Sequence, residues 1–230
     1  MKKDFEKLAE KLGVSFNDIE FLCTALTHRS YLNEHHDVRE HNERLEFLGD
    51  AVLELVVTEH LYRNFDNPEG DLTNWRSALV KTETISGVAK ELDVEEYILM
   101  SRGEARSLGR SRQLILANSF EAIVGSIFLD QGLDEASKFI KKNLIIKLEK
   151  ILKEKSYVDP KSLLQEVVQD IEGVTPNYEV LEEEGPDHDK TFTIGVFVGE
   201  KLWGKGVGPS KQAAQQSAAE DAIKKSKLKK

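Results

Sequence analysis

Three carboxylates lie three and then four residues apart in residues 41–50, which read HNERLEFLGD. At about 100° per residue, Glu43, Glu46 and Asp50 would share a narrow wedge of one helix face. Apolar side chains would lie roughly opposite, as a half-buried helix requires. Like charges at these spacings repel each other and weaken a helix. The stripe is therefore either solvated or neutralised by a cation, and for the stripe alone solvation is the simpler interpretation.

A second group of oxygen-bearing side chains interrupts the most apolar segment of the chain, residues 114–130. Its hydrophobic stripe runs almost all the way round, which predicts the central helix of a helical domain. Asn118 and Glu121 are three residues apart and share one face of it. A buried glutamate is unfavourable unless it is paired or binds a metal ion. Gly125 offers a flat site where another helix can approach closely.

The elements that position these residues are helical in the first two thirds of the chain. Apolar periodicity predicts helices over residues 1–12, 18–31, 43–65, 84–92, 114–130 and 133–152. Another helix follows Pro68 and Gly70, with Asp71 or Thr73 as its N-cap, and residues 101–112 are expected to form a mobile basic loop.

The composition changes after a polar stretch that ends in a proline. A helix over residues 160–171 is followed by alternating segments over 178–181, 191–198 and 201–207 and by an alanine-rich helix over 210–225. We predict an all-α domain over 1–152, a linker over 153–158 and a small α-β-β-β-α domain over 159–228.

The overall composition of the chain argues against several classes of protein. The net charge of −9 argues against a general nucleic-acid coat protein, so any polyanion-binding surface must be local. No signal peptide or membrane span is expected, and the single cysteine, Cys23, is expected to be a reduced thiol. His28, His35, His36 and His41 lie close in sequence, but without a cysteine they do not favour a zinc site.

Several motifs, in order along nearly the whole chain, resemble the ribonuclease III family. Residues 41–53 resemble its signature, residues 68–72 (PEGDL) its acidic turn, and residues 115–122 (ILANSFEA) its second metal-ligand helix. Residues 159–166 (DPKSLLQE) and the last helix are similar to its double-stranded-RNA-binding domain. The resemblance implies a cytoplasmic endoribonuclease that hydrolyses double-stranded RNA to 5′-phosphate and 3′-hydroxyl ends, with processing of rRNA precursors and other structured RNA as its role.

The resemblance also implies a metal site whose ligands come from two helices: Glu46, Asp50, Asn118 and Glu121. Oxygen ligands without histidine or cysteine suit Mg²⁺, with Mn²⁺ as a substitute. Glu121 is the strongest catalytic candidate, and Asp50 follows as a ligand or as the residue that orients the attacking water. Glu43 and Glu69 resemble the family's accessory acids near the scissile phosphates.

Asn118 departs from the family pattern, which most often has aspartate at this position. Asparagine offers one carbonyl oxygen but no charge, which predicts weaker metal binding. We expect an active enzyme, because the other five carboxylates are present. The alternative is a double-stranded-RNA-binding protein that no longer cuts. A third option, a helical scaffold with solvated acidic stripes, does not explain the C-terminal domain.

The remaining implied contacts are with RNA and with a second subunit. The residues expected at the duplex are Gln165 and Glu166 in one minor groove, His188 in the next, and Ser210 and Lys211 on the phosphates between them. Gln212 replaces a second lysine that is common in the family, which predicts weaker anchoring. Because one site cuts one strand, the family resemblance implies a homodimer. Phe47 would suit a dimer contact, with packing inside the monomer as the alternative.

Overall fold

The computed structural model describes residues 4–154, 157, 159–186 and 190–225. The chain divides into two units, residues 1–157 and 158–230, each considered by itself below. The first is helical, and in the second a helix precedes three antiparallel strands and a last helix. The predicted fold class is therefore confirmed. The limits 1–152, 153–158 and 159–228 stay a prediction; helix α8 (Leu148–Glu154) extends into the expected linker.

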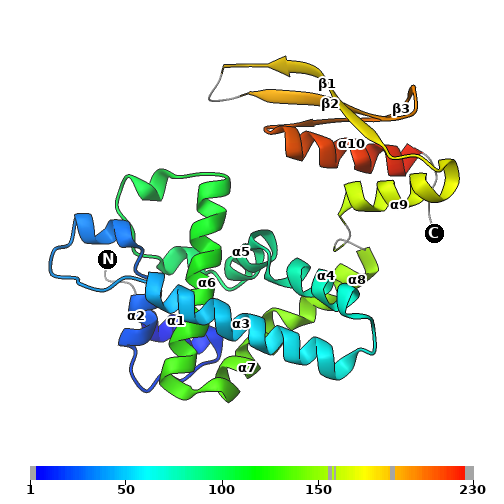
Figure 1. The fold of residues 1–230 in the computed structure, drawn as a ribbon. Helices are drawn as coiled ribbons and strands as arrows, with labels where there is room; N and C mark the ends of the chain where they lie inside the picture. The colour runs from blue at the N-terminus through cyan, green and yellow to red at the C-terminus, as the bar shows by residue number, and fades with distance from the viewer. Residues whose placement is uncertain (1–3, 155–156, 158, 187–189, 226–230) are drawn as a thin grey trace. The chain divides into compact units, whose positions relative to one another are not determined.

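The first unit is built around two long helices, α3 (Glu43–Asn64) and α6 (Arg110–Gln131), which pack against each other (Figure 1). Phe120, Ile123 and Ile127 of α6 are fully buried. In the described part of the chain, α6 alone is long and apolar enough to cross a membrane, and 61% of that apolar window is buried in this unit. It is thus the core helix that its hydrophobic pattern predicts. The other helices of the unit are α1 (Phe5–Leu12), α2 (Glu20–Ala25), α4 (Glu69–Val80), α5 (Thr82–Glu91), α7 (Leu133–Asn143) and α8.

Two glycines lie where α3 and α6 cross. A Cβ atom added to Gly49 would lie 1.8 Å from the carbonyl oxygen of Glu121, and one added to Gly125 would lie 2.2 Å from that of Leu45. No side chain fits in either space, so the two backbones are in direct contact. The expected close approach at Gly125 is confirmed, and Gly49 is its counterpart on α3.

The predicted helix over residues 18–31 is wrong in its second half. Helix α2 ends at Ala25, and a 3₁₀ helix follows over Arg29–Asn33. Between them the chain pairs with a distant segment: the Leu99 N–H donates to the Leu26 carbonyl at 2.7 Å, and the His28 N–H donates to the Leu99 carbonyl at 2.9 Å. This long-range pairing replaces the helical hydrogen bonds and is invisible in the local pattern.

Three further boundaries need correction. Helix α4 begins at Glu69 with no side-chain cap, so neither Asp71 nor Thr73 is the N-cap. The expected loop over residues 101–112 is shorter, because α6 begins at Arg110 and the Arg112 Nε is 2.7 Å from a carboxylate oxygen of Glu95. The expected helix over 133–152 is interrupted by a 3₁₀ turn over Ile145–Lys147.

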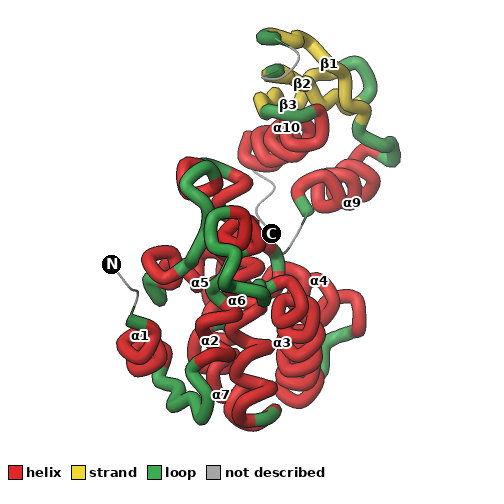
Figure 2. The backbone as a smooth tube through the Cα atoms, turned by 90° about the vertical axis from the view of Figure 1, so that its left-hand side faces the viewer, coloured by secondary structure: helices red, strands yellow, loops and turns green. Residues whose placement is uncertain are grey.

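The second unit contains α9 (Pro160–Glu172), β1 (Asn177–Glu184), β2 (Thr191–Val198), β3 (Lys201–Gly208) and α10 (Lys211–Lys225). The sheet order is β1-β2-β3 and both pairings are antiparallel. One face of the sheet is covered by α10, whose buried alanines pack against the glycines of β3 (Figure 2). A Cβ on Gly206 would lie 2.1 Å from the Ala218 nitrogen, so small residues on both sides set the distance between helix and sheet.

Candidate active site

The α3–α6 crossing brings together the four residues expected at a metal. On α3, Glu46 and Asp50 lie on either side of Gly49 in sequence, and on α6 Glu121 is one turn before Gly125. The Asn118 side chain hydrogen-bonds to the Glu46 carboxylate, and the charges of Asp50 and Glu46 both act on Glu121. The contact of the two backbones at the glycines is what brings these side chains within reach of one another.

The electrostatics of this cluster are unfavourable for carboxylates. Burial raises the pKa of Glu121 to about 8, and repulsion from Asp50 and Glu46 adds to the effect. Burial also raises the pKa of Glu46, helped by the charges of Glu43 and Asp50 and opposed by the hydrogen bond from Asn118. The charged groups that act on Glu121 are all carboxylates, so the negative charge of the cluster is not balanced by its own side chains.

The donor set fits a hard divalent cation. Three carboxylates and the Asn118 amide offer only oxygen as metal ligand, the preference of Mg²⁺ and similar ions. Within the described residues, no three His, Cys, Asp or Glu side chains already form a metal-binding group. An ion would therefore have to draw the side chains of Glu46, Asp50 and Glu121 toward a common point, and Asn118 would have to turn its carbonyl oxygen toward the ion.

The two accessory acids lie in different places. Glu43 is next to the cluster: its charge acts on Glu46, and its own carboxylate is 3.5 Å from Arg29 and 3.9 Å from His41. Glu69, at the start of α4, lies in a groove of about 770 Å³ with Thr58 of α3. Thr58 is two helical turns beyond Asp50, which corresponds to about 12 Å. The structure therefore brings Glu43 to the cluster but does not bring Glu69 there.

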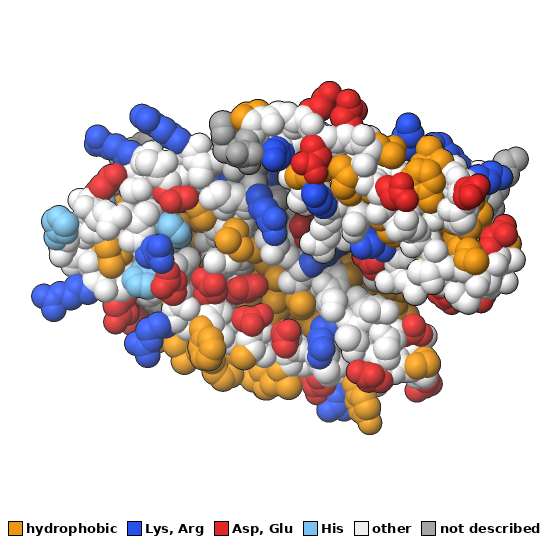
Figure 3. All heavy atoms as spheres, turned by 45° about the horizontal axis from the view of Figure 1, so that its top comes forward, with side chains coloured by type: hydrophobic (Ala, Val, Ile, Leu, Met, Phe, Trp, Pro, Cys, Tyr) orange, Lys and Arg blue, Asp and Glu red, His pale blue; other side chains and the backbone are white. Residues whose placement is uncertain are grey.

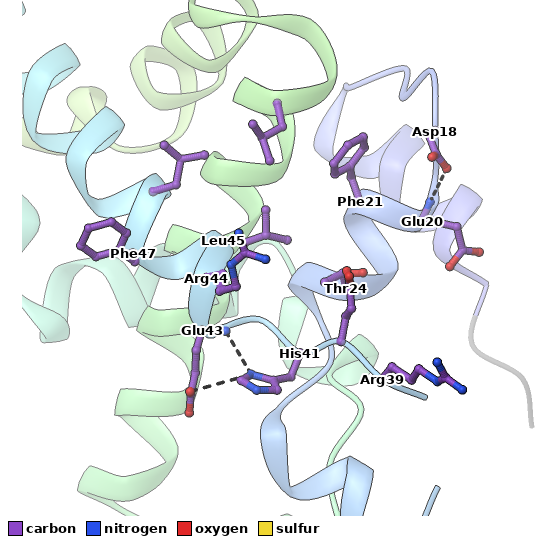
Figure 4. A pocket seen from close by; sticks show the side chains of 13 residues that line it. Asp18, Glu20, Phe21, Thr24, Arg39, His41, Glu43, Arg44, Leu45 and Phe47 are labelled. Atoms are coloured by element: carbon purple, nitrogen blue, oxygen red, sulfur yellow. Dashed lines mark hydrogen bonds and ion pairs between the residues drawn. The ribbon is translucent and has the colours of Figure 1, made fainter. Parts of the chain in front are cut away.

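Phe47 projects from α3 into solvent, with 82% of its surface exposed. Packing inside its own unit, the alternative to a dimer contact, is therefore wrong. The side chain lies at the rim of a groove of about 940 Å³ that is lined in part by Phe21, Leu48 and Leu129. His41 and Glu43 border the same groove, with the Glu43 N–H directed at the His41 Nδ1 at 3.5 Å (Figure 4).

The expected RNA-binding residues of the second unit are exposed where the structure describes them. Gln165 and Glu166 lie on the solvent side of α9. Ser210 precedes α10, and its hydroxyl accepts a hydrogen bond from the Ala213 N–H at 3.2 Å. Lys211 is the first residue of α10. His188 lies outside the described residues.

Comparison with known proteins finds relatives of both units. A family model described as Ribonuclease-III-like matches residues 18–148. The chain is 44% identical over 227 residues to Ribonuclease 3 of Roseiflexus sp. (strain RS-1), covering 97% of this chain and 96% of the relative. The chain belongs to the ribonuclease III family. A model of the double-stranded RNA binding motif matches residues 160–226.

Other relatives support the same assignment. Ribonuclease 3 of Streptococcus gordonii is 43% identical over 227 residues, which are 98% of this chain and 97% of the relative. The nuclease domain of ribonuclease III from Campylobacter jejuni is 41% identical, with a TM-score of 0.55, and the match covers 61% of this chain and 98% of that domain. That structure was described for flexibility in a region involved in dimer formation.

As a ribonuclease III with a double-stranded-RNA-binding domain, the protein is an endoribonuclease that hydrolyses double-stranded RNA. Family membership also implies a requirement for a divalent metal ion. The same comparisons favour the enzyme over the alternative of a binding protein that has lost catalysis.

Two features of these sites were missed from the sequence. Gly49 is the first: its position between Glu46 and Asp50, together with Gly125, could have indicated the crossing point. The second is an ion pair between Lys211 and Glu183 of β1. No sequence signal indicates this pair, because it depends on the register of the strands.

Proposed function

We propose that Glu46, Asp50, Asn118 and Glu121 together hold a divalent ion, Mg²⁺ with Mn²⁺ as a substitute, and that this site cleaves RNA to 5′-phosphate and 3′-hydroxyl ends. The observation that carries the proposal is the unbalanced charge at the α3–α6 crossing, seen in the raised pKa of Glu121, about 8. A bound cation removes the repulsion between these carboxylates. Glu121 would give up its proton when it serves as a ligand.

Each residue has a distinct task in this proposal. When bound, the ion lowers the pKa of a coordinated water and offsets the negative charge that develops on the phosphate. Glu121 holds a proton in the metal-free protein and would serve as a ligand from the rigid core helix. Asp50 orients the attacking water from the opposite helix. Asn118 fixes the Glu46 carboxylate through their hydrogen bond. Glu43 and Glu69 act as accessory acids along the RNA.

We propose that Asn118 weakens the metal site without abolishing catalysis. Its carbonyl can replace one carboxylate oxygen, but its neutral amide adds no charge to attract the ion. The site still has the three carboxylates of Glu46, Asp50 and Glu121. The enzyme should therefore need more Mg²⁺ than a variant with aspartate at this position.

We propose a homodimer in which Phe47 of each subunit enters the groove beside Phe21 and Leu129 of the other. Two-fold symmetry requires a self-complementary surface, and here an exposed aromatic side chain and an apolar groove lie next to each other. Leu55 is 56% exposed further along α3, and Figure 3 shows hydrophobic side chains gathered beside acidic ones on one face. Two sites per dimer would cut both strands and leave short 3′ overhangs.

In this proposal the second unit binds the RNA duplex. Gln165 and Glu166 reach ribose 2′-hydroxyls in one minor groove, and His188 contacts the next. Ser210 and Lys211 bind the intervening phosphates, where free N–H groups at the start of α10 add to the lysine charge. Processing of rRNA precursors and other structured RNA in the cytoplasm is the proposed role.

A cleavage assay tests the metal site. The purified protein is incubated with a long, end-labelled RNA duplex in EDTA and then across separate Mg²⁺ and Mn²⁺ titrations. Cleavage should require the metal, and the Glu121→Gln variant should bind the duplex without cutting it. Cleavage in EDTA, or an unchanged rate in the variant, would refute the proposal.

A further inference from the structure

Lys211, the residue expected to bind a phosphate, has a carboxylate partner within its own domain. Its Nζ is 3.0 Å from a carboxylate oxygen of Glu183 on β1 and 5.5 Å from the centre of the Phe192 ring on β2. The lysine side chain is 58% exposed, so solvent and ligands can still reach it. A carboxylate at this position opposes the binding of a polyanion, since both compete for one ammonium group.

The register of the sheet puts Glu183 in this position. Glu183 pairs with Phe192 across β1 and β2, and Phe192 pairs with Gly208 across β2 and β3. Gly208 lies close to the first turn of α10, since a Cβ there would be 2.7 Å from the Ala214 nitrogen. The three paired residues therefore form a row across the sheet that leads to Lys211.

An irregularity in β1 selects which glutamate faces the lysine. The pairing runs from Val180 opposite Ile194 directly to Glu182 opposite Thr193, so Leu181 is an extra residue in the strand. Without this bulge, Glu182 would pair with Phe192 and Glu183 would move one position further along. Bulges of this kind redirect side chains at the edges of sheets, and here the bulge determines the partner of Lys211.

We infer that Glu183 is an affinity-limiting residue of the RNA-binding domain, which competes with the RNA phosphate for the Lys211 ammonium. The inference rests on the proposed role of Lys211 as a phosphate contact. On binding, the duplex displaces Glu183 from Lys211 and leaves a carboxylate within a Debye length, about 10 Å, of the RNA backbone. The ion pair thus lowers the duplex affinity by an amount that salt modulates.

Removal of the carboxylate should tighten binding. Exposed ion pairs of this type are worth up to about fivefold in an equilibrium constant, and relief of the repulsion adds to that. In the full-length protein that carries Glu121→Gln, so that the RNA stays intact, Glu183→Gln should lower the Kd for an RNA duplex longer than about 16 base pairs by roughly three- to tenfold.

The salt dependence separates this role from a structural one. Lys211 is neutralised by Glu183, so Glu183→Gln adds one unpaired positive charge at the phosphate. The slope of log Kd against log salt concentration should steepen by up to about 0.9. Glu182→Gln is the matched control, because it removes the same charge from the same strand, where Glu182 is exposed and pairs with Thr193. It should have a much smaller effect on both Kd and slope.

Lys211→Ala distinguishes failure of this inference from failure of the proposed RNA contact. If Lys211→Ala leaves the Kd unchanged, Lys211 is not a phosphate contact. If it weakens binding, the gain from Glu183→Gln should disappear in the double variant, because the two residues act on each other. The inference is overturned if Glu183→Gln matches Glu182→Gln, weakens binding, or retains its gain in the Lys211→Ala background.

Discussion

Glu121→Gln should stabilise the metal-free protein at neutral and alkaline pH while it abolishes cleavage. The folded state holds the Glu121 proton with a pKa of about 8, whereas the ordinary pKa of a glutamate side chain is 4.5. Because the folded state binds this proton more tightly than the unfolded chain, ionisation of Glu121 destabilises the fold. The loss of stability begins as the pH rises above 4.5 and is complete above about 8. Glutamine is nearly isosteric and has no such proton.

The size of the effect follows from the two pKa values. Each pH unit between them corresponds to about 1.4 kcal/mol. Because the difference in bound protons is incomplete near pH 5 and near pH 8, the wild-type protein should lose about 3.5 kcal/mol relative to the variant between these two values. At pH 8 a saturating divalent ion should restore most of this loss in the wild type. The variant should gain much less from the ion.

Chemical denaturation in EDTA across this pH range measures the difference. Trp75 is buried in α4 of the nuclease unit, so its fluorescence reports unfolding of that unit once the other tryptophan, Trp203, is replaced by phenylalanine. Glu54→Gln is the control, because Glu54 is an exposed glutamate on the same α3 helix. Parallel pH profiles for the wild type and Glu121→Gln would show that Glu121 carries no buried charge and would refute the electrostatic account of the site.

Three further predictions concern the metal site, the proposed dimer contact and the helix crossing. Asn118→Asp should lower the Mg²⁺ concentration for half-maximal cleavage severalfold, as measured by titration; an equal or higher requirement would contradict the proposed role of the amide. Phe47→Asp should convert the dimer to a monomer in sedimentation velocity and reduce double-strand cleavage, whereas an unchanged dimer would exclude this contact. Gly49→Ala should destabilise the nuclease unit by about 3 kcal/mol or more, because its Cβ would lie 1.8 Å from a carbonyl oxygen. Gly87→Ala, a control with open space around it in helix α5, should instead stabilise the protein by roughly 0.5–1 kcal/mol in the same denaturation experiment.

Apolar patterns were sufficient to predict the long helices α3 and α6 and the presence of three successive strands between two helices. Only the first half of β1 was predicted, because that strand is almost wholly exposed and its second half is charged. The patterns failed where a distant segment determines the backbone, as at Leu26 and His28, whose hydrogen bonds go to Leu99. They also failed at the start of α4, where Pro68 precedes the first turn and no side-chain cap is needed. Local patterns cannot show such tertiary contacts.

For the active site, spacing along each helix predicted which side chains share a face but not how deeply each is buried. The apolar segment around Glu121 already indicated burial, whereas Glu46 lies on the acidic face of a half-buried helix; the pKa is raised to about 8 only for Glu121. The difference arises because Glu121 belongs to the central helix. The size of its pKa shift depends on the packing of α6 against four other helices, α2, α3, α5 and α7, and on the charges of Asp50 and Glu46. The order of residues along the chain does not show which charges this packing brings together.

The glycine pair connects the stability of the fold to its chemistry. Helices normally pack with their axes 8–10 Å apart, at a distance set by the side chains in contact. Where Gly49 and Gly125 meet, the backbones approach more closely, and acidic side chains from both helices are brought together despite their repulsion. The packing energy of the buried α6 face is what keeps these carboxylates near one another before any ion binds. A substitution that widens the crossing should therefore raise the Mg²⁺ requirement even where the protein still folds, because the ligands would start further apart.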